Sequence, residues 1–260
     1  MNVENSPPVL HELENGTATL TLNRPEKRNA LSLELMRAFL AELKVIRDST
    51  ATQVVVVRGA GTVFSSGHDL KELHSHRNKE YLKAVFSTCS EMMSAIVSLP
   101  QPVIAAVHGV ASAAGCQLVA SCDLAIATAE ARFAVPGVNI GLFCSTPMVA
   151  LSRAVSRKHA MEMLLTGELY SAVHAERIGL VNRVVAASEL DREVHDLCAK
   201  ITAKSRRTIA TGKAAFYRQL EMGYDEAYDC TGQIMVENML GPEAEEGIGA
   251  FLEKRPPVWP

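Results

Sequence analysis

The spacing of apolar residues changes from one period to another near the start of the chain. Residues 9–14 (VLHELE) and 17–23 (TATLTLN) are two strand-like runs, and the second alternates strictly between polar and apolar side chains, which predicts two β-strands. The Asn15-Gly16 pair between them favours a tight hairpin turn. From Ser32, a residue type preferred at helix N-caps, apolar side chains recur at helical spacing through residue 48. The chain therefore opens with a β-hairpin followed by an amphipathic helix.

Continuous apolar runs follow, and they alternate with helical patterns. Residues 53–59 (QVVVVRG) and 102–109 (PVIAAVHG) lack the alternation of a half-exposed strand, so they predict strands buried on both faces. Between them, residues 78–99 carry an apolar stripe at helical spacing that Pro100 ends. This order of strand, helix and strand predicts an α/β fold with right-handed crossovers.

The second half of the chain becomes mostly helical. Residues 123–135 return to strand character, and residues 179–185 (GLVNRVV) form the last predicted strand. Helical patterns then continue from Ser188 to Lys254. We therefore expect a core over residues 1–200 and a helical C-terminal region over residues 201–260, of a kind that often mediates oligomerisation.

Composition narrows the choice of partners. The chain has 260 residues, a formal net charge of −3 and 5% aromatic residues, so neither a basic surface nor a set of stacking rings predicts nucleic-acid binding. A long stretch without a charged side chain, residues 102–122, contains Gln117 and two glycines and has no basic anchors at its ends. It is interpreted as a buried strand and helix, and no membrane partner is expected.

Cysteine usage predicts the compartment. The six cysteines form no CxxC pair and no regular framework, which is typical of free thiols in a reducing environment. The N-terminal residues lack the basic and apolar segments of a secretory signal. We therefore expect a cytoplasmic protein.

Two loops rich in small residues follow buried strands. Residues 59–73 include Gly67-His68, and residues 109–115 lead into a helix. Free backbone N–H groups at a helix N-terminus stabilise negative charge, so the two loops together could form a two-donor oxyanion hole. Small residues can equally serve only to pack a helix closely on a strand, and the pattern alone leaves both interpretations open.

Other chemistries fit the sequence less well. Phe64 stands where a dinucleotide-binding loop would place its third glycine, and no helix follows directly. The histidines of HDLKELHSH, residues 68–76, match no zinc spacing, so no metal is expected. A serine-peptidase turn would need its serine at Ala113, whereas Ser112 stands one position early. No cofactor is predicted.

Cys144 and Ser145 in GLFCSTP are candidate nucleophiles or acid/base groups. A buried structural cysteine is the more common role for such a residue. Gln117, a neutral amide among small and apolar residues, is similarly open to two interpretations. It can bind a water or a substrate oxygen, or it can be a core amide that bonds a neighbouring backbone group.

Over nearly its whole length the chain resembles the enoyl-CoA hydratase/isomerase (crotonase) family. The motifs that carry the resemblance are LNRPEKRNALS, FSSGHDLKEL, PVIAAVHGVASAAGCQLVASCDLAIA, FAVPGVNIGL, GLVNRVV and GIGAFLEKRPPVW. The GHDL, AAGCQL and GLFCSTP motifs resemble most the enoyl-CoA hydratase domain-containing subgroup. The resemblance implies a spiral of ββα units, a helical C-terminal trimerisation region and often hexamers. It also implies lyase or isomerase chemistry on acyl-CoA thioesters of fatty acid metabolism, with coenzyme A as part of the substrate.

The resemblance assigns roles to particular positions. The family's two oxyanion-hole donors correspond to the backbone N–H groups of His68 and Ala114. The substrate-binding positions that it implies are Lys27, Arg28, His68, Asp69, Leu70, Lys71 and Ala114. Asp123 matches a family aspartate that we expect to be structural.

The departures from the family concern acid/base catalysis. The two glutamates of family hydratases correspond to Gln117 and Gly137, and an aspartate used by some isomerases corresponds to Ser145. None of these three residues exchanges a proton near neutral pH. Each general acid or base contributes about 10²–10⁴-fold, so we expect weak hydratase activity from an acyl-CoA-binding protein that stabilises a thioester enolate. Residual proton transfer is assigned to Asp69, Cys144, Ser145 or an ordered water. A non-catalytic acyl-CoA binder with a regulatory or scavenging role is the alternative.

Overall fold

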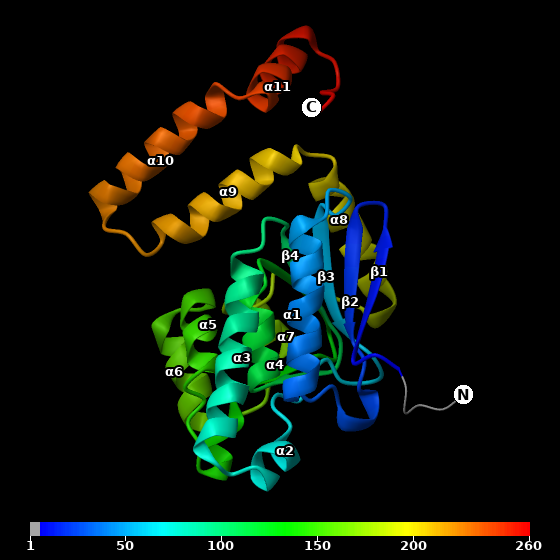
Figure 1. The fold of residues 1–260 in the computed structure, drawn as a ribbon, viewed down its shortest axis with the longest axis vertical. Coiled ribbons are helices and arrows are strands. Elements are labelled where there is room, and N and C mark those ends of the chain that lie inside the picture. Colours follow the sequence, from blue (N-terminus) through cyan, green and yellow to red (C-terminus); the bar gives the residue numbers. More distant parts are fainter. Residues whose placement is uncertain (1–5) are drawn as a thin grey trace.

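A computed structural model describes residues 6–260, and a six-stranded sheet lies at its centre (Figure 1). The strand order is β1-β2-β3-β4-β6-β9, in which β1 and β2 pair antiparallel and the other neighbours pair parallel. The strands are β1 (Val9–Glu14), β2 (Thr17–Leu22), β3 (Val54–Gly59), β4 (Val103–Val107), β6 (Leu124–Thr128) and β9 (Arg183–Val185). The predicted hairpin and the predicted parallel α/β sheet are confirmed.

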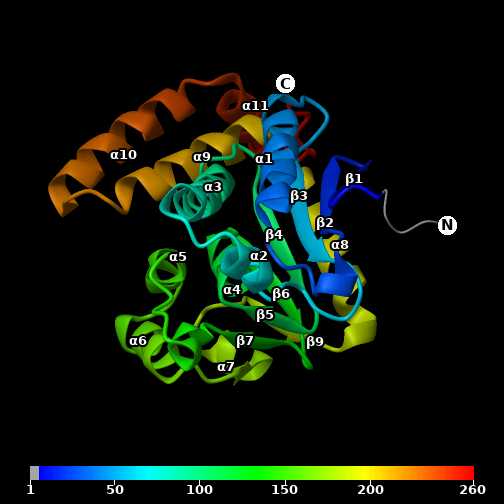
Figure 2. The ribbon, with the colours of Figure 1, turned by 60° about the horizontal axis from the view of Figure 1, so that its bottom comes forward.

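A second, three-stranded sheet lies beside the first (Figure 2). It consists of β5 (Val110–Ser112), β7 (Arg132–Ala134) and β8 (Tyr170–Ser171). The chain passes from β4 through Gly109 into β5, and later from β6 into β7, before a helical segment follows each time. The sequence did not predict β5 or β8, because strands of two or three residues are too short to show a period and form only by pairing with distant segments.

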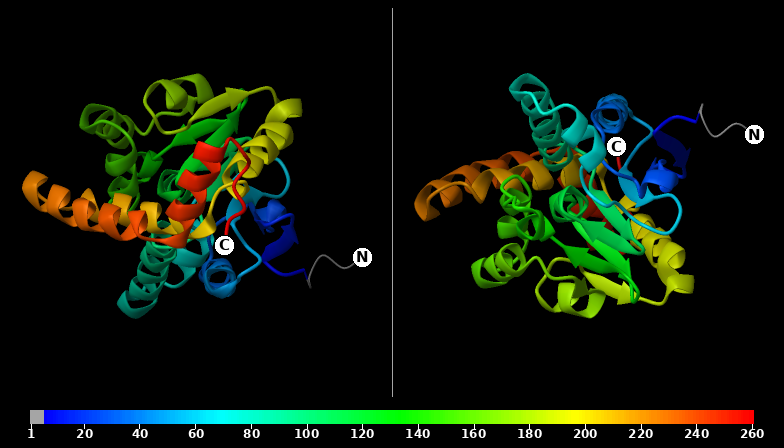
Figure 3. Two further views of the ribbon diagram at one scale, coloured as in Figure 1. Left: turned by 90° about the horizontal axis from the view of Figure 1, so that it is seen from above. Right: turned by 90° about the horizontal axis from the view of Figure 1, so that it is seen from below.

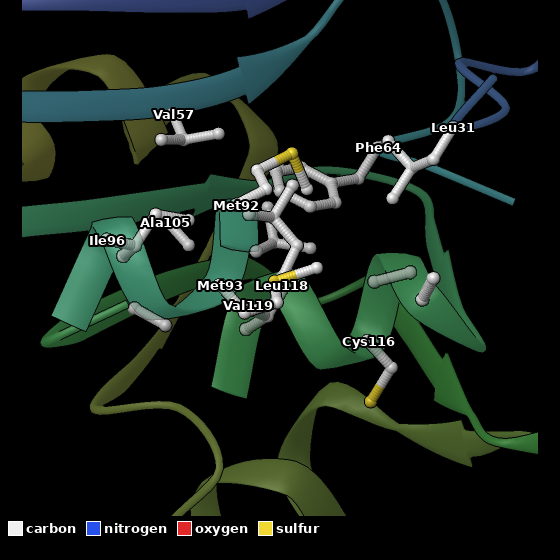
Figure 4. Packing of buried hydrophobic residues seen from close by; sticks show 14 of the residues in the cluster. Leu31, Val57, Phe64, Met92, Met93, Ile96, Ala105, Cys116, Leu118 and Val119 are labelled. Atoms are coloured by element: carbon white, nitrogen blue, oxygen red, sulfur yellow. The ribbon is translucent and has the colours of Figure 1, made fainter. Parts of the chain in front are cut away.

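Helices cover both faces of the large sheet. On one face lie α1 (Leu33–Asp48), α3 (Lys79–Val97) and α4 (Ala114–Ser121), and on the other lies α8 (Leu190–Thr202). Alternate residues of β3 and β4 enter the two cores: Val57 and Ala105 face α3 and α4, whereas Val56 and Ala106 face α8. Figure 4 shows Val57 and Ala105 packed with side chains of α3 and α4. Burial on both faces explains the uninterrupted apolar runs of these strands.

Shorter helices complete the part of the chain that carries the two sheets. They are α2 (Leu70–Ser75), α5 (Pro147–Ala154), α6 (Arg157–Thr166) and α7 (Ala172–Arg177), with single 3₁₀ turns at Pro25–Lys27, Pro136–Ile140 and Ala187–Glu189. Among residues 6–260, none of the helices combines the length and the apolar character needed to cross a bilayer.

The C-terminal region is helical, as predicted. It comprises α9 (Arg206–Gln219), α10 (Tyr224–Met239) and α11 (Pro242–Glu253), and α10 extends away from the sheets (Figure 3). The preceding helix α8 ends at Thr202, close to the predicted division between residues 1–200 and 201–260, which stays a prediction.

A buried polar cluster attaches α9 to the core. Asp123, which follows α4, accepts hydrogen bonds from Lys213 Nζ at 2.6 Å and Tyr217 Oη at 2.8 Å, both on α9, and from the Val103 amide at 2.7 Å. The Lys213 and Asp123 side chains are only 8% and 15% exposed. Asp123 therefore has the structural role that the sequence led us to expect.

Candidate functional site

The two loops singled out in the sequence are hydrogen-bonded to each other. Ser65 in the first loop forms a parallel β-bridge with Ala111 of β5. Its amide donates to Val110 O at 3.1 Å, and its carbonyl accepts from the Ser112 amide at 2.9 Å. Because of this bridge, residues 65–68 lie directly against the N-terminus of α4.

Two glycines make this close approach possible. A Cβ atom at Gly115 would lie 2.4 Å from the carbonyl oxygen of Ser65. Gly67 has φ +89°, and a Cβ there would lie 2.9 Å from Ser112 O and 3.2 Å from the Ala114 nitrogen. Any side chain at either position would separate the loops. The structure thus favours close packing and places the backbone of the first loop beside the Ala114 amide.

The amides of His68 and Ala114 are unpartnered. Neither N–H donates to an acceptor among residues 6–260. The Ala114 amide is the first of α4, where the helix dipole favours negative charge. Ala113 before it has φ +49° and ψ −115°, a rare conformation for a residue with a Cβ, and such strain is concentrated at functional sites. The site therefore presents two free backbone donors in adjoining segments.

The His68 side chain is held as a neutral ring beneath the loop. Its Nδ1 lies 3.3 Å from the Leu31 carbonyl oxygen, so Nδ1 carries the hydrogen and donates it. The ring packs edge-on against Phe86, with centroids 5.3 Å apart. Burial lowers the pKa of His68 below its usual value, and the Leu31 contact opposes this only in part. His68 therefore contributes its backbone amide and a packed ring, and no positive charge at neutral pH.

Gln117 lies on α4, three residues after Ala114, and is only 4% exposed. Its Oε1 is 3.8 Å from the Cys89 sulfur, whose thiol donates to it. The side chain is also on the wall of a cavity of about 780 Å³ between α3, α4, α5 and α9. Apolar residues of all four helices line this cavity, including Met93, Val119, Val149 and Phe216.

Gly137 and Cys144 are in direct contact. The Gly137 amide donates to Cys144 Sγ at 3.3 Å, and burial raises the pKa of this thiol above its usual value. A Cβ at Gly137 would lie 2.9 Å from Cys144 Sγ and 2.8 Å from Leu142 O. The space in which a glutamate would begin is therefore filled. Ser145 is exposed, and its hydroxyl donates to the Phe143 carbonyl at 3.3 Å.

The predicted substrate-binding residues lie around the His68 loop. Lys27, Arg28 and Lys71 are exposed, and the Arg28 carbonyl accepts from the Ser66 amide at 3.0 Å, which joins the Arg28 backbone to the His68 loop. Leu70, half exposed, begins α2. Asp69 is its N-cap, accepting from the Glu72 amide at 3.3 Å, and also lies 3.6 Å from Arg24. Asp69 is thus engaged in holding the loop.

Sequence reasoning missed three residues that organise the site. Buried Asn29, at φ +51°, donates to the carbonyls of Ala60 and Val63 and fixes the start of the first loop. Glu72 accepts from Tyr81 Oη at 2.6 Å. Cys89 orients Gln117. Asparagine's tolerance of positive φ was a usable signal for Asn29, whereas the other two contacts join separate helices and leave no local pattern.

Outside this site, side chains of the kinds that can ligate a metal lie close together at one place among the described residues. His159 and Glu162 of α6 and His174 of α7 have ligand atoms within 4.8 Å of one another. Arg177 donates to His174 Nδ1 at 2.9 Å, so Nε2 carries the hydrogen and has no free lone pair. The histidines of residues 68–76 do not belong to this group. The expectation that no metal is needed stays a prediction.

Comparison with known proteins identifies the fold and the family. The family described as enoyl-CoA hydratase/isomerase matches residues 12–260. Human enoyl-CoA hydratase domain-containing protein 3, mitochondrial, is 50% identical over 244 residues, which cover 94% of this chain and 80% of that protein. Its Xenopus laevis counterpart is 46% identical over 258 residues, which cover 99% and 88%. The resemblance to the domain-containing subgroup is confirmed.

Solved structures agree with this assignment. An enoyl-CoA hydratase from Mycobacterium smegmatis has a TM-score of 0.96 and 51% identity, covering 98% of this chain and 99% of that one. The structure of human enoyl-CoA hydratase domain-containing protein 3 has a TM-score of 0.94 and 48% identity, covering 97% and 100%. The expected crotonase-type fold is confirmed.

The expectation of a cytoplasmic protein is wrong. Relatives from frog, rat, human, mouse and zebrafish, 45–50% identical, are all named mitochondrial. Free cysteines indicate only a reducing environment, so they do not separate the cytoplasm from other reducing compartments. The sequence, the fold and the matched length agree on one conclusion: the chain belongs to the enoyl-CoA hydratase/isomerase family.

Proposed function

We propose that this protein binds acyl-CoA thioesters and stabilises their enolates, with weak or no hydratase activity. The observation that carries the proposal is the pair of unpartnered amides at His68 and Ala114 on two hydrogen-bonded loops. A thioester carbonyl oxygen that accepts from both amides gains most when it becomes an enolate oxygen. The N-terminus of α4 adds a partial positive charge at the same point.

The surroundings of this pair suit a CoA thioester. Lys27, Arg28 and Lys71 are exposed, and their positive charges can pair with the phosphate groups of coenzyme A. The cavity beside Gln117, with its apolar lining, offers space for an acyl chain. Coenzyme A enters as part of the substrate, and no further cofactor is proposed.

Weak hydration follows from the side chains at the reacting carbons. Hydration requires a base for the water and an acid for C2. Gln117 does not titrate, Gly137 has no side chain, and burial raises the pKa of the Cys144 thiol, which also accepts the Gly137 amide. None of these three residues is ready to exchange a proton there near neutral pH.

The same observation supports the second candidate, an acyl-CoA binder without turnover. A protein that keeps the binding amides and lacks both carboxylates has what recognition needs and lacks what catalysis needs. Binding and turnover must therefore be measured separately.

We also propose that the protein assembles with itself through its C-terminal helices, as a trimer or hexamer. Helices α9 and α10 bury no residue fully, and α10 exposes several large apolar side chains: Tyr224, Tyr228, Met235, Val236 and Met239. Sedimentation of wild type against Met235→Glu tests this, with Lys200→Glu on α8 as a control. A monomeric wild type would contradict the assembly.

The functional test is a panel of acyl-CoA thioesters of increasing length. Calorimetry gives binding, and absorbance and thiol release report hydration, isomerisation and hydrolysis. Binding with slow conversion supports enolate stabilisation, and binding with no conversion favours the non-catalytic candidate. Failure to bind any acyl-CoA contradicts both.

A further inference from the structure

The orientation of the Gln117 amide is determined by a partner on another helix. The Cys89 thiol lies 3.8 Å from Oε1 and donates to it, and burial raises the pKa of this thiol to about 12, which keeps it protonated. In this arrangement the thiol is the donor and the amide oxygen is the acceptor. Oε1 therefore faces α3, and Nε2 faces the opposite way.

Nε2 is a donor without a protein acceptor. It carries two N–H groups, and none of residues 6–260 accepts a hydrogen bond from it. Gln117 is 4% exposed and is one of the residues that line the cavity of about 780 Å³. Because the N–H₂ group has no acceptor among these residues, an acceptor on a ligand in the cavity can pair with it.

The position of Gln117 selects which ligand atom that acceptor is. Ala114 and Gln117 are three residues apart on α4, so they lie on the same side of the helix about one turn apart. A thioester oxygen held at the Ala114 amide places the acyl carbons that follow it next to Gln117. A substituent on C3 is within reach of a side chain about 5–6 Å away along the helix.

We propose that Gln117 donates a hydrogen bond to an oxygen on C3 of the acyl group, and that the site therefore prefers 3-oxoacyl-CoA thioesters. This inference rests on the proposed binding of acyl-CoA enolates. The enolate of a 3-oxoacyl thioester shares its negative charge between two oxygens. The His68 and Ala114 amides then serve the thioester oxygen, and Gln117 serves the C3 oxygen.

The same chemistry explains the missing carboxylates. The C2 hydrogen of a 3-oxoacyl thioester is acidic because both carbonyls share the resulting charge, so it is lost to bulk water as a hydronium ion without a protein base. An ionised glutamate at position 117 would repel the anion, whereas an amide donor attracts it. The replacement of the family glutamate by Gln117 thus changes which acyl group the site prefers.

The test compares acetoacetyl-CoA with butyryl-CoA, two ligands that differ only at C3. We expect wild-type protein to bind acetoacetyl-CoA about 10–100-fold more tightly in calorimetry, the range for hydrogen bonds to charged groups. Gln117→Leu abolishes this preference, because only acetoacetyl-CoA has an oxygen on C3 that loses its donor. Gln117→Glu makes acetoacetyl-CoA the weaker of the two ligands, because an ionised carboxylate repels its enolate. Gln219→Leu, at a half-buried position on α9, is the control and leaves the preference unchanged.

A second variant tests the orientation itself. Cys89→Ala removes the thiol that fixes Oε1, so the amide can rotate and the preference falls about threefold. The near-ultraviolet absorbance of bound acetoacetyl-CoA reports whether the enolate forms. Equal affinity of wild type for both ligands, or a preference that survives Gln117→Leu, overturns the inference while the proposed function stands. Failure of both ligands to bind overturns both.

Discussion

Glutamate introduced separately at positions 137 and 117 is expected to give opposite results: Gly137→Glu lowers stability without faster hydration, and Gln117→Glu speeds hydration. Gly137→Glu must place a side chain where its Cβ lies 2.8 Å from Leu142 O, 2.9 Å from Cys144 Sγ and 3.2 Å from the Cys144 nitrogen. Two of these three contacts are backbone atoms, which cannot rotate away. Overpacking of this kind costs about 1–3 kcal/mol. In a chain of this size that corresponds to a fall of roughly 2–10 °C in Tm.

Gln117→Glu meets no such obstacle, because glutamate and glutamine have nearly the same shape. Burial will raise the pKa of the new carboxyl group and leave it able to exchange a proton near neutral pH. One general acid or base contributes about 10²–10⁴-fold, so we expect crotonyl-CoA hydration to rise by about 10²-fold. Gly137→Glu alone is expected to give no rise.

Absorbance at the enoyl thioester band and thermal melting measure the two effects together. Gly137→Glu combined with Cys144→Ala separates the causes, since it removes the sulfur and leaves the Leu142 carbonyl in place. We expect this double variant to recover part of the lost Tm. A Gly137→Glu protein with unchanged Tm and faster hydration would refute the steric reasoning.

Three further predictions follow from contacts in the fold. Asp123→Asn leaves the Lys213 ammonium buried without its carboxylate, so we expect the free energy of unfolding in urea to fall by about 3–5 kcal/mol. An unchanged urea midpoint would show that other contacts attach α9 to the core. Ala113→Gly relieves the backbone strain at φ +49° but increases the entropy of the unfolded chain, so we expect the free energy of unfolding to rise by up to about 1 kcal/mol. A lower free energy of unfolding would mean that the Ala113 Cβ contributes packing. Burial lowers the pKa of His68, so its contribution to stability is present above its unfolded pKa of about 6.5 and is lost as pH falls through the folded value. His68→Phe is expected to weaken the decline of Tm below pH ~6, and an unaltered pH profile would contradict this.

The sequence predicted the elements whose signals are local. The β1–β2 hairpin follows from two strand-like runs on either side of Asn15-Gly16, and α1 follows from helical spacing after Ser32, whose hydroxyl accepts from the Leu35 amide. The small sheet of β5, β7 and β8 was not predicted because its strands pair only with segments far along the chain.

At the site, the sequence predicted positions but not their contacts. Resemblance to the family singled out His68, Ala114 and Gln117, and the β-bridge from Ser65 to Ala111 explains why the two loops meet. The orientation of the Gln117 amide depends on Cys89, 28 positions earlier on another helix. Such contacts depend on how helices pack, which no periodicity records.

The most direct test of the central claim is a measurement of crotonyl-CoA binding and hydration on one wild-type preparation. A family hydratase with both glutamates is assayed alongside it. The account predicts stoichiometric binding together with hydration at least ~10⁴-fold slower than in that enzyme, from the loss of two acid/base groups. Tight binding with hydration at a comparable rate would contradict it, because the two free amides would then suffice without either carboxylate.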